Sequence, residues 1–568
     1  MRTRKLQALT IVLTFILASA GLSPALSQFS GEGAGTEEDP YIIINVEQLQ
    51  EMSNYVAAHF ELGNDIDATE TAEWNEGEGF KPIEGTFTGS LDGSGFSISG
   101  LTVNRPESQV GLFSSMGSEG KVSNLGLEDI TYIGDGGIGG IAGVSRGTIS
   151  DSYATGNIMG VTPAIGGLVG NLTSSATITN SHADVNVEGE QSWVGGLAGL
   201  ASGEITASYA TGNVTGVGID IGGLVGDNQG TITDTYATGN VNGGDNRVGG
   251  LVGRNHSVAT ITGSYATGNV NGDGTDTGGL VGRNNGTITL SSSSGEITGN
   301  DETGGLVGRN GNSGEITASF GTGNVIVNGS GMVGGLVGNN TGVIRNSYAT
   351  GNVMGDGGFL GGFAGNNTGG EIESSYAAGK VSENGFSGGF AGANSEEGVA
   401  SSYWNSEMNP ELNSVGFMGN ETGISGNSSV QMTQQSSFDE WGFGGIWTIT
   451  EGSTYPWLQE NQQSPPPMPE LGTGTESDEL VSTYKLFENY PNPFNPSTEI
   501  RFAIPEQAHV SLTVYNLIGQ QVATLVNENR NPGLYYVSFD ASGLSSGVFL
   551  YRFEAGDYVE TRQMMFVK

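Results

Sequence analysis

The chain has 568 residues, including 99 glycines and no cysteine, and its formal net charge at pH 7 is −41. This composition excludes a disulfide-stapled fold, and the negative charge argues against nucleic acid or anionic lipid as a partner. Apolar residues make up 35% of the chain and recur in an ordered pattern, which excludes a disordered chain.

Residues 1–27 have the composition of a cleaved signal peptide. The basic residues Arg2, Arg4 and Lys5 precede an apolar stretch, and an A-x-S cleavage site follows at 25–27. The apolar stretch is shorter than the roughly 20 residues of a membrane span, so we expect an exported chain without a transmembrane anchor. Without this segment, 16 Lys and Arg face 60 Asp and Glu, a net charge of −44.

Residues 28–138 are expected to form an N-terminal cap and the first, degenerate coils of a repeat. Asn45 can N-cap a short helix that places Val46 and Leu49 on one face. Short strand patterns follow in FELGNDID and GTFTGSLDGSGFSISGLTV, and a degenerate copy of the later repeat starts at Val110.

Residues 139–400 repeat one phrase, of which GGLVGDNQGTITDTYATGNVNG at 222–243 is typical. Successive Gly-Gly pairs are 26 to 30 residues apart. Three short runs rich in Val, Ile, Thr and Tyr alternate with Gly, Asn and Asp, which indicates short strands joined at corners where Gly or Asn supplies a positive φ. One coil cannot bury its apolar side, but stacked coils can, with paired strands about 4.8 Å apart. The sequence therefore predicts an all-β parallel β-helix (β-solenoid) with three short strands per coil of about 27–28 residues.

Identical residues are expected to stack in columns along this solenoid. One position holds leucine in seven copies and Ile141, Phe363 or Phe390 in three others. The asparagine of the TGN phrase also recurs, and stacked amides can hydrogen-bond along a column. The leucines are Leu168, Leu197, Leu224, Leu251, Leu280, Leu306 and Leu336, and the asparagines are Asn157, Asn213, Asn240, Asn269, Asn324 and Asn352.

The repeat ends near residue 400 and the chain then changes character twice. Residues 401–458 are expected to cap the apolar end of the solenoid, residues 459–483 form a Pro-rich acidic linker, and residues 484–568 have the period-two patterns of a small antiparallel Ig-like β-sandwich. The bulky residues available to the cap are Trp404, Trp441, Trp447 and Trp457.

The repeat G-G-L-V-G-x-N-x-G-x-I-x-x-S-Y-A-T-G-N-V, over residues 139 to about 400, resembles the GLUG motif of bacterial exported proteins. Proteins with this motif include adhesin-like surface proteins, and the motif also accompanies zinc-dependent IgA-specific peptidases, whose catalytic domain is separate. The resemblance implies an adhesin-like surface role.

Residues 484–568 resemble the type A C-terminal sorting domain of the type IX secretion system. The phrases YKLFENYPNPFNPSTEIRFAIP, VYNLIGQQVATL and GLYYVSFDASGLSSGVFLYRF and the ending QMMFVK carry this resemblance. It implies that the type IX secretion machinery is a partner of this domain, and that the protein is delivered to the outer cell surface or released.

No catalytic or metal site is predicted. A zinc peptidase needs an H-E-x-x-H spacing, but the four histidines, His59, His182, His256 and His509, are far apart. β-Helix lyases and hydrolases use clustered carboxylates with Arg or Lys, whereas residues 139–400 hold only seven Lys and Arg and no long insertion. Asp220, Asp227 and Asp234 are interpreted as corner and surface residues.

A structural calcium ion is an alternative with little support, and no other cofactor is expected. Asp273 with Asp276, and Asp65 with Asp67, place carboxylates near carbonyl-rich turns. Neither pair belongs to a known calcium-loop pattern, so solvated turns are favoured.

The best binding candidate is a column of aromatic residues. Outward-facing rings could stack on sugars, whereas inward-facing rings would be core. The flanking Ser and Ala leave both orientations open, and we favour a core or packing role. The candidate ligand-binding residues are Tyr153, Tyr209, Tyr236, Tyr265, Tyr348 and Tyr376, with His182, Phe320 and Tyr403 in the same column.

The sequence thus predicts a secreted or surface-displayed, non-enzymatic solenoid that acts as an adhesin or stalk and binds glycans or another surface. Two alternatives stay open: a carbohydrate-active β-helix enzyme, and an accessory scaffold for another secreted enzyme.

Overall fold

The computed structural model describes residues 29–459, apart from 328, 396, 397 and 418, and residues 484–567, with gaps at 487, 488, 490–493, 495, 506, 517, 531, 532 and 557. The chain divides into two compact units, Met1–Pro469 and Glu470–Lys568. The expected signal peptide (1–27) and residues 460–483 of the expected linker lie outside the described residues.

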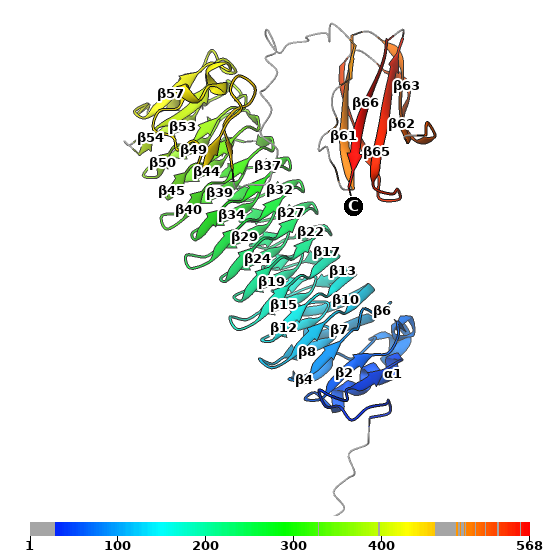
Figure 1. Cartoon of the computed structure of the whole chain (residues 1–568). Helices are drawn as coiled ribbons and strands as arrows, with labels where there is room; N and C mark the ends of the chain where they lie inside the picture. The colour runs from blue at the N-terminus through cyan, green and yellow to red at the C-terminus, as the bar shows by residue number, and fades with distance from the viewer. Residues whose placement is uncertain are drawn as a thin grey trace, which may run out of the picture. The chain divides into compact units, whose positions relative to one another are not determined.

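The first unit is a parallel β-solenoid whose coils stack along three sheets (Figure 1). The predicted fold class is confirmed. Sheet A has 14 strands and carries the Thr-Ile-Thr phrases. Its strands, in spatial order, are β1 (Tyr41–Ile43), β2 (His59–Leu62), β5 (Ser90–Asp92), β9 (Lys121–Ser123), β12 (Thr148–Ser150), β16 (Thr177–Thr179), β20 (Glu204–Thr206), β25 (Thr231–Thr233), β30 (Thr260–Thr262), β35 (Thr287–Thr289), β40 (Glu315–Thr317), β45 (Val343–Arg345), β50 (Glu371–Glu373) and β54 (Val399–Ala400).

Sheet C has 13 strands and carries the Val-Gly-x-Asn phrases. They are β4 (Ile83–Phe87), β8 (Phe113–Met116), β11 (Ala142–Ser145), β15 (Val169–Leu172), β19 (Ala198–Ala201), β24 (Val225–Asn228), β29 (Val252–Asn255), β34 (Val281–Asn284), β39 (Val307–Asn310), β44 (Val337–Asn340), β49 (Ala364–Asn367), β53 (Ala391–Asn394) and β56 (Val415–Phe417).

Sheet B lies between A and C along the chain, and in most coils it is broken into short strands. It begins with β3 (Ile66–Asp67), β6 (Ser97–Ser99), β7 (Thr102–Val110), β10 (Gly126–Ile138), β13 (Tyr153–Gly160), β14 (Ile165–Gly166), β17 (His182–Gly189) and β18 (Val194–Gly195). The aromatic column continues on β21 (Tyr209–Ala210), β26 (Tyr236–Ala237), β31 (Tyr265–Ala266), β36 (Ser292–Ser293), β41 (Phe320–Gly321), β46 (Tyr348–Ala349), β51 (Tyr376–Ala377), β55 (Ser402–Asn405) and β57 (Ile424–Asn427). The next strands of each coil are β22 (Val214–Gly216), β27 (Val241–Gly243), β32 (Val270–Gly272), β37 (Ile297–Gly299), β42 (Val325–Val327) and β47 (Val353–Gly355). Those before the Gly-Gly corner are β23 (Ile221–Gly222), β28 (Val248–Gly249), β33 (Thr277–Gly278), β38 (Thr303–Gly304), β43 (Met332–Gly334), β48 (Phe359–Gly361) and β52 (Phe386–Gly388).

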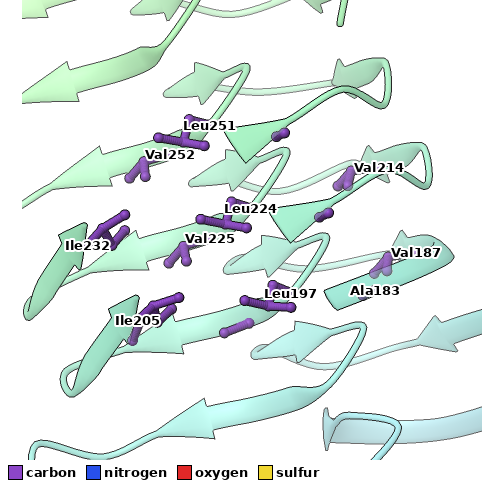
Figure 2. Packing of buried hydrophobic residues seen from close by; sticks show 14 of the residues in the cluster. Ala183, Val187, Leu197, Ile205, Val214, Leu224, Val225, Ile232, Leu251 and Val252 are labelled. Carbon is purple, nitrogen blue, oxygen red and sulfur yellow. The ribbon is translucent and has the colours of Figure 1, made fainter. Parts of the chain in front are cut away.

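The register between coils is one whole repeat, so like residues stack. Ile205 pairs with Ile232, which pairs with Ile261. All members of the predicted leucine column, including Ile141, Phe363 and Phe390, are fully buried. Figure 2 shows Leu197, Leu224 and Leu251 stacked in this core beside the isoleucines of sheet A. The core is therefore one continuous apolar column inside the coils.

The glycines of the Gly-Gly pairs permit close packing of the backbone. The expectation that Gly or Asn supplies the positive φ at corners holds at Asn180, Gly263 and Asn346, but not for these pairs. A Cβ on Gly222 would lie 2.1 Å from the carbonyl oxygen of Val225, and one on Gly223 would lie 2.1 Å from that of Gly250. Neither has a positive φ, whereas the corner residues Asp220 (φ 64°) and Asp234 (φ 52°) do. Other coils place Ala, Leu or Ser at the same corners, because the stacked hydrogen bonds on both sides impose the turn.

Two asparagine columns hydrogen-bond along the solenoid. In the predicted TGN column, the exposed side chain of Asn213 accepts a hydrogen bond from the backbone N–H of Asn240 at 3.0 Å. Most links of this ladder have backbone donors, whereas Asn186 donates to Asn157 through its side chain. A second column, which sequence reasoning missed, is buried at the end of the sheet C strands, where each amide nitrogen donates to the next amide oxygen at 2.8–3.0 Å. Its members are Asn228, Asn255, Asn284, Asn310, Asn340, Asn367 and Asn394.

The N-terminal end is closed as predicted. Asn45 accepts a hydrogen bond from the backbone N–H of Gln48 at 2.9 Å and caps α1 (Val46–Glu51). Val46 and Leu49 are buried at 3% and 0% exposure. The short helices η1 (Met52–Asn54) and η2 (Thr69–Gly77) follow.

The C-terminal segment uses its tryptophans in two ways. Trp404 packs over Gly389 and belongs to the core cluster, so it closes the apolar end as predicted. Trp441 and Trp447 instead form a second cluster with aromatic residues of sheet B, outside the core. This cluster includes parts of η3 (Gln431–Thr433) and the hairpin of β58 (Trp447–Thr448) and β59 (Trp457–Leu458); η4 (Gln435–Ser437) lies between them in sequence.

The second unit is the predicted antiparallel β-sandwich. One sheet contains β60 (Lys485–Leu486), β61 (Ser497–Ile504) and β64 (Gly533–Asp540), and the other contains β63 (Gln521–Arg530), β62 (Ala508–Asn516), β65 (Gly547–Ala555) and β66 (Tyr558–Phe566). Alternate residues such as Val510, Leu512 and Val514 are fully buried in its core. No helix in the described ranges of the two units has the length and apolar character needed to cross a membrane.

Candidate functional site

The predicted aromatic column lies on the outside of the solenoid. In β26, Ala237 belongs to the core cluster while Tyr236 is half-buried outside it, and β21 and β31 repeat this arrangement. The rings of the column are therefore outside the main solenoid core, while Phe320, Tyr348, Tyr376 and Tyr403 are buried in a second cluster. The rings of the column pack against one another along the solenoid.

The rings of five successive coils form one stack. The centroids of Tyr209 and Tyr236 are 4.5 Å apart, those of Tyr236 and Tyr265 are 5.0 Å apart, and their planes are within 7° of parallel. His182 continues the stack to Tyr153. Because each interior ring face lies against the next ring, solvent reaches mainly the edges and hydroxyls of this open half of the column.

The C-terminal half of the column is covered. Phe320, Tyr348 and Tyr376 stack in the same way at 4.6 and 5.1 Å, but they are at most 3% exposed. Trp447 lies 6.0 Å from Tyr376, and the Tyr376 hydroxyl donates to the carbonyl oxygen of Pro456 at 2.8 Å. Candidates Tyr348 and Tyr376 therefore have a structural role, and the rings open to a ligand are those from Tyr153 to Tyr265.

Three rings of the open half are held in their neutral forms. Partial burial, then the neighbouring Tyr209 and Tyr265, raise the pKa of Tyr236 above its ordinary value. A hydrogen bond to the Glu128 carboxylate, followed by burial, raises the pKa of Tyr153 to about 12. Burial lowers the pKa of His182, so this ring is neutral at pH 7. Tyr153, His182 and Tyr236 are therefore neutral rings at pH 7.

A second set of residues, stacked along the coils, contains most of the basic side chains of the repeat region. In four successive coils it combines the corner residue before the Gly-Gly pair with the third residue of the following sheet C strand, seven positions later. His256, which pairs with Asp227, is added to it. We call it the charged track. Its members are Asp220, Asp227, Arg247, Arg254, His256, Asp276, Arg283, Glu302 and Arg309.

Every acid of the charged track lies beside a basic partner. Arg247 Nε lies 3.0 Å from Asp220 Oδ1, and His256 Nε2 lies 2.8 Å from Asp227 Oδ1. The other two pairs, Arg283 with Asp276 and Arg309 with Glu302, lie within single coils at 2.5 and 3.4 Å. The acids lie beneath the bases, since the side chains of Asp220, Asp227 and Asp276 are at most 4% exposed and those of Arg283 and Arg309 are 32% and 38% exposed.

Two of these carboxyls hold protons more tightly than usual. Burial raises the pKa of Asp220 to about 6, against the opposing effect of Arg247. Burial, then a hydrogen bond with the Asp276 carboxyl, raises the pKa of Glu302 to about 7. Asn339 also donates to Glu302 Oε1 at 3.0 Å. The structure thus brings an acid with a pKa near neutrality next to a second carboxyl, an arrangement that sequence reasoning missed.

The sequence interpretation of the three aspartates is partly wrong. Asp234 is an exposed corner residue as expected, but Asp220 and Asp227 are buried at 1% and 2% exposure. The signal that could have found them is the spacing of seven residues that also relates Asp276 to Arg283 and Glu302 to Arg309.

The calcium candidates use their carboxylates within the protein. Asp276 pairs with Arg283, while Asp65 and Asp67 accept hydrogen bonds from the backbone N–H groups of Ser97 and Thr69. Across the described ranges, no group of three or more His, Asp or Glu side chains is arranged to hold a metal ion.

Apolar side chains continue the charged track at both ends. Trp193 occupies the corner before Asp220, and Phe359 and Phe386 occupy later corners of the same column. Phe386 is 45% exposed and lies 4.6 Å from the ring of Phe417. The track is therefore a polar segment flanked by accessible aromatic groups.

Comparison with protein families identifies two parts of the chain. The GLUG motif matches residues 162–188, 244–271 and 329–354, and the secretion system C-terminal sorting domain matches residues 488–568. The chain is thus a GLUG-repeat β-solenoid with a type IX secretion sorting domain. This domain directs the protein to the cell surface or the extracellular medium and engages the type IX secretion machinery.

Two curated proteins are similar to parts of the chain. Halomucin of Haloquadratum walsbyi is 39% identical over 157 residues, which are 25% of this chain and 2% of halomucin. A putative Gly-rich membrane protein of Evansella cellulosilytica is 38% identical over 107 residues, which are 18% of this chain and 12% of that protein. The chain therefore spans a small part of the length of these relatives. No solved structure matches.

Proposed function

We propose that the protein is a non-enzymatic adhesive stalk, held at the cell surface or released, that binds glycans along its outer face. The observation that carries this proposal is the open half of the aromatic column, in which rings from Tyr153 to Tyr265 lie side by side outside the core. The sorting domain and the similarity to halomucin support a role outside the cell.

The chemistry of this column suits weak, repeated contacts. Tyrosine hydroxyls can donate to and accept from sugar hydroxyls, and the ring edges offer apolar contact. Each coil repeats the contact about 4.8 Å further along, so a polymer parallel to the solenoid would meet several rings at once. Summed contacts of this kind give useful avidity from weak single interactions.

The full chain should be screened on a glycan array while its action on the bound polysaccharides is assayed as release of reducing ends or unsaturated products. The double variant Tyr209→Ala/Tyr236→Ala is expected to lose at least about tenfold in affinity, since two central rings are removed. Tyr376→Phe is the matched control, because that ring is covered and cannot touch a ligand. Unchanged binding by the double variant would contradict the proposal, and so would product release.

A carbohydrate-active enzyme is the second candidate, favoured by the Asp276 and Glu302 pair. An acid with a pKa of about 7 beside a second carboxyl has the composition of a glycosidase acid-base pair. Against this role, the side chain of Asp276 is only 1% exposed and lies beneath Arg283. If the assay detects product release, Glu302→Gln should abolish it; persistence of release in this variant would exclude the pair.

A further inference from the structure

We propose that the charged track binds a glycan bearing isolated carboxylates, such as a sparsely substituted uronic acid polymer, with Arg254 receiving one carboxylate. This inference rests on the proposed glycan-binding function and moves the selective contact from the aromatic column to a different side of the coils.

Charge pairing singles out Arg254. The four acids of the track are matched by Arg247, His256, Arg283 and Arg309. Arg254 lowers the pKa of Asp220 and stacks on Asp227, but these two acids already pair with Arg247 and His256. Among the described residues, Arg254 itself forms no ion pair, and its buried Nε has no hydrogen-bond partner. A guanidinium presents two N–H groups in a plane that matches a carboxylate, so an external carboxylate would complete the pairing.

The neighbours of Arg254 suit a sugar. In sheet C it lies between Asp227 and Arg283, and two coils before it in the corner column is Trp193. Two coils correspond to roughly 10 Å, about the reach of a short oligosaccharide. Trp193 is half-buried, and its side chain hydrogen-bonds Asp220 of the track. A pyranose ring could therefore pack on Trp193 while a nearby unit places its carboxylate on Arg254.

Charge also limits the kind of ligand. Residues 139–400 contain seven Lys and Arg, and four of them are in the track, while the whole chain carries a net charge of −41. A dense polyanion would meet one unpaired cation and many repelling carboxylates. At physiological salt, charges more than about 8 Å away are screened, so one carboxylate at Arg254 feels mainly its local surroundings. Sparse carboxylates on a neutral backbone fit this balance best.

The aromatic column is less suited to the selective contact. Its interior ring faces are covered by neighbouring rings at 4.5–5.2 Å. The charged groups that act on its rings, Glu128, Asp65 and Asp184, are acids. A carboxylate would gain nothing there. The two surfaces are therefore distinguishable by the charge of the ligand.

The test measures binding of the full chain to three probes: glucuronoxylan, the same polymer after reduction of its carboxyls to alcohols, and polygalacturonate. We expect glucuronoxylan to bind at least about tenfold more tightly than the reduced polymer, as for loss of one charged hydrogen-bonded pair. Polygalacturonate should bind more weakly than glucuronoxylan.

Arg254→Gln should remove the preference for the unreduced polymer, and Arg254→Lys should retain part of it because the charge stays. Arg345→Gln is the matched control: this arginine of sheet A is 37% exposed and already pairs with Glu371 and Glu373. If Arg254→Gln lowers the thermal midpoint, the comparison of Arg254→Lys with the wild type carries the test.

Equal affinity for the unreduced and reduced polymers, or an unchanged preference in Arg254→Gln, would overturn the inference and leave the proposed glycan-binding function standing. Absence of binding to glucuronoxylan would also overturn it. Absence of binding to every glycan of the array would remove the proposed function as well, so the two failures are separate.

Discussion

In the aromatic column, each ring lies against a ring of nearly the same kind, whereas in the charged track an acid lies against a base. Tyr209, Tyr236 and Tyr265 repeat with their planes within 7° of parallel. Along the corner column of the track, Asp220 is followed by Arg247 and then by Asp276. Coils about 4.8 Å apart allow neutral groups to stack on copies of themselves, but identical buried charges at this distance repel. Buried acids of the track are therefore matched by a base, and where Asp276 stacks on Glu302 the pKa of Glu302 is raised. The residue type at the corner consequently changes from coil to coil, which hides the track in the repeat.

The covered half of the aromatic column offers the largest effect. Trp447→Ala should reduce the free energy of unfolding of the C-terminal cap by about 4 kcal/mol, because a fully buried tryptophan that packs on Tyr348 and Tyr376 is lost. Hydrogen exchange of residues 430–458 would measure it. Trp457→Ala, at a half-buried position, should cost less. Equal losses in the two variants would show that the cap does not depend on the aromatic column.

The second-largest effect is expected when one ion pair of the charged track is broken. Arg247→Met should destabilise the solenoid by about 3 kcal/mol at pH 8, because Asp220 stays buried without its partner. The loss should shrink near pH 5, where Asp220 takes up a proton. Thermal midpoints at the two pH values would measure this. Arg345→Met, on the exposed face of sheet A, should cost less than about 1 kcal/mol. A loss that does not change with pH would contradict the burial argument.

The titration of Glu302 makes the stability of the charged track depend on pH. Its folded pKa of about 7 lies above the ordinary 4.5, so the folded state favours the protonated acid. Stability from this group is fully present below pH 4.5 and is lost as pH rises through 7. Glu302→Gln should therefore stabilise the protein by about 2 kcal/mol at pH 8 and have little effect at pH 4. Denaturant unfolding of the variant and the wild type at pH 8 and pH 4 would measure the two differences in stability. An equal difference at both pH values would argue against a protonated Glu302.

Tyrosine hydroxyls should give the smallest effect. Tyr376→Phe removes the buried hydrogen bond to Pro456 and should cost about 1 kcal/mol. Tyr236→Phe removes a hydroxyl from the half-exposed column and should cost close to nothing. Unfolding of the two variants in urea would compare them. A larger loss for Tyr236→Phe would mean that the open half is held together by its hydroxyls and not by ring stacking.

Much of the fold could be predicted from the sequence because the residue pattern that specifies one coil is repeated in the next. The leucine column, the Asn45 cap and the strands around Leu512 all follow from local periodicity and capping chemistry. The role of the glycines could not be read in this way. Gly222 and Gly223 are needed because backbones of adjacent coils approach closely, which is a property of the stack and not of one turn.

The two candidate sites also differ in how far the sequence could predict them. The sequence located every ring of the aromatic column but could not decide between core and surface. Neighbouring residues of a strand, such as Tyr236 and Ala237, point to opposite faces, and the pattern does not say which of the two faces the core. The sequence missed the charged track because the members of each pair are seven, 27 or 29 residues apart and because the residue type at the corner position changes from coil to coil.

The sequence alone determined the repeat, the stacking of like residues, the caps and the sorting domain, because short-range pattern and self-pairing are enough to specify a solenoid. The tertiary structure decided which rings remain open, since only the fold of residues 430–458 back onto sheet B covers Tyr348 and Tyr376 while leaving Tyr236 accessible. It also decided which charges are paired, because the packing of neighbouring coils buries Asp220 and Asp276 under arginines and leaves Arg254 unmatched among the described residues.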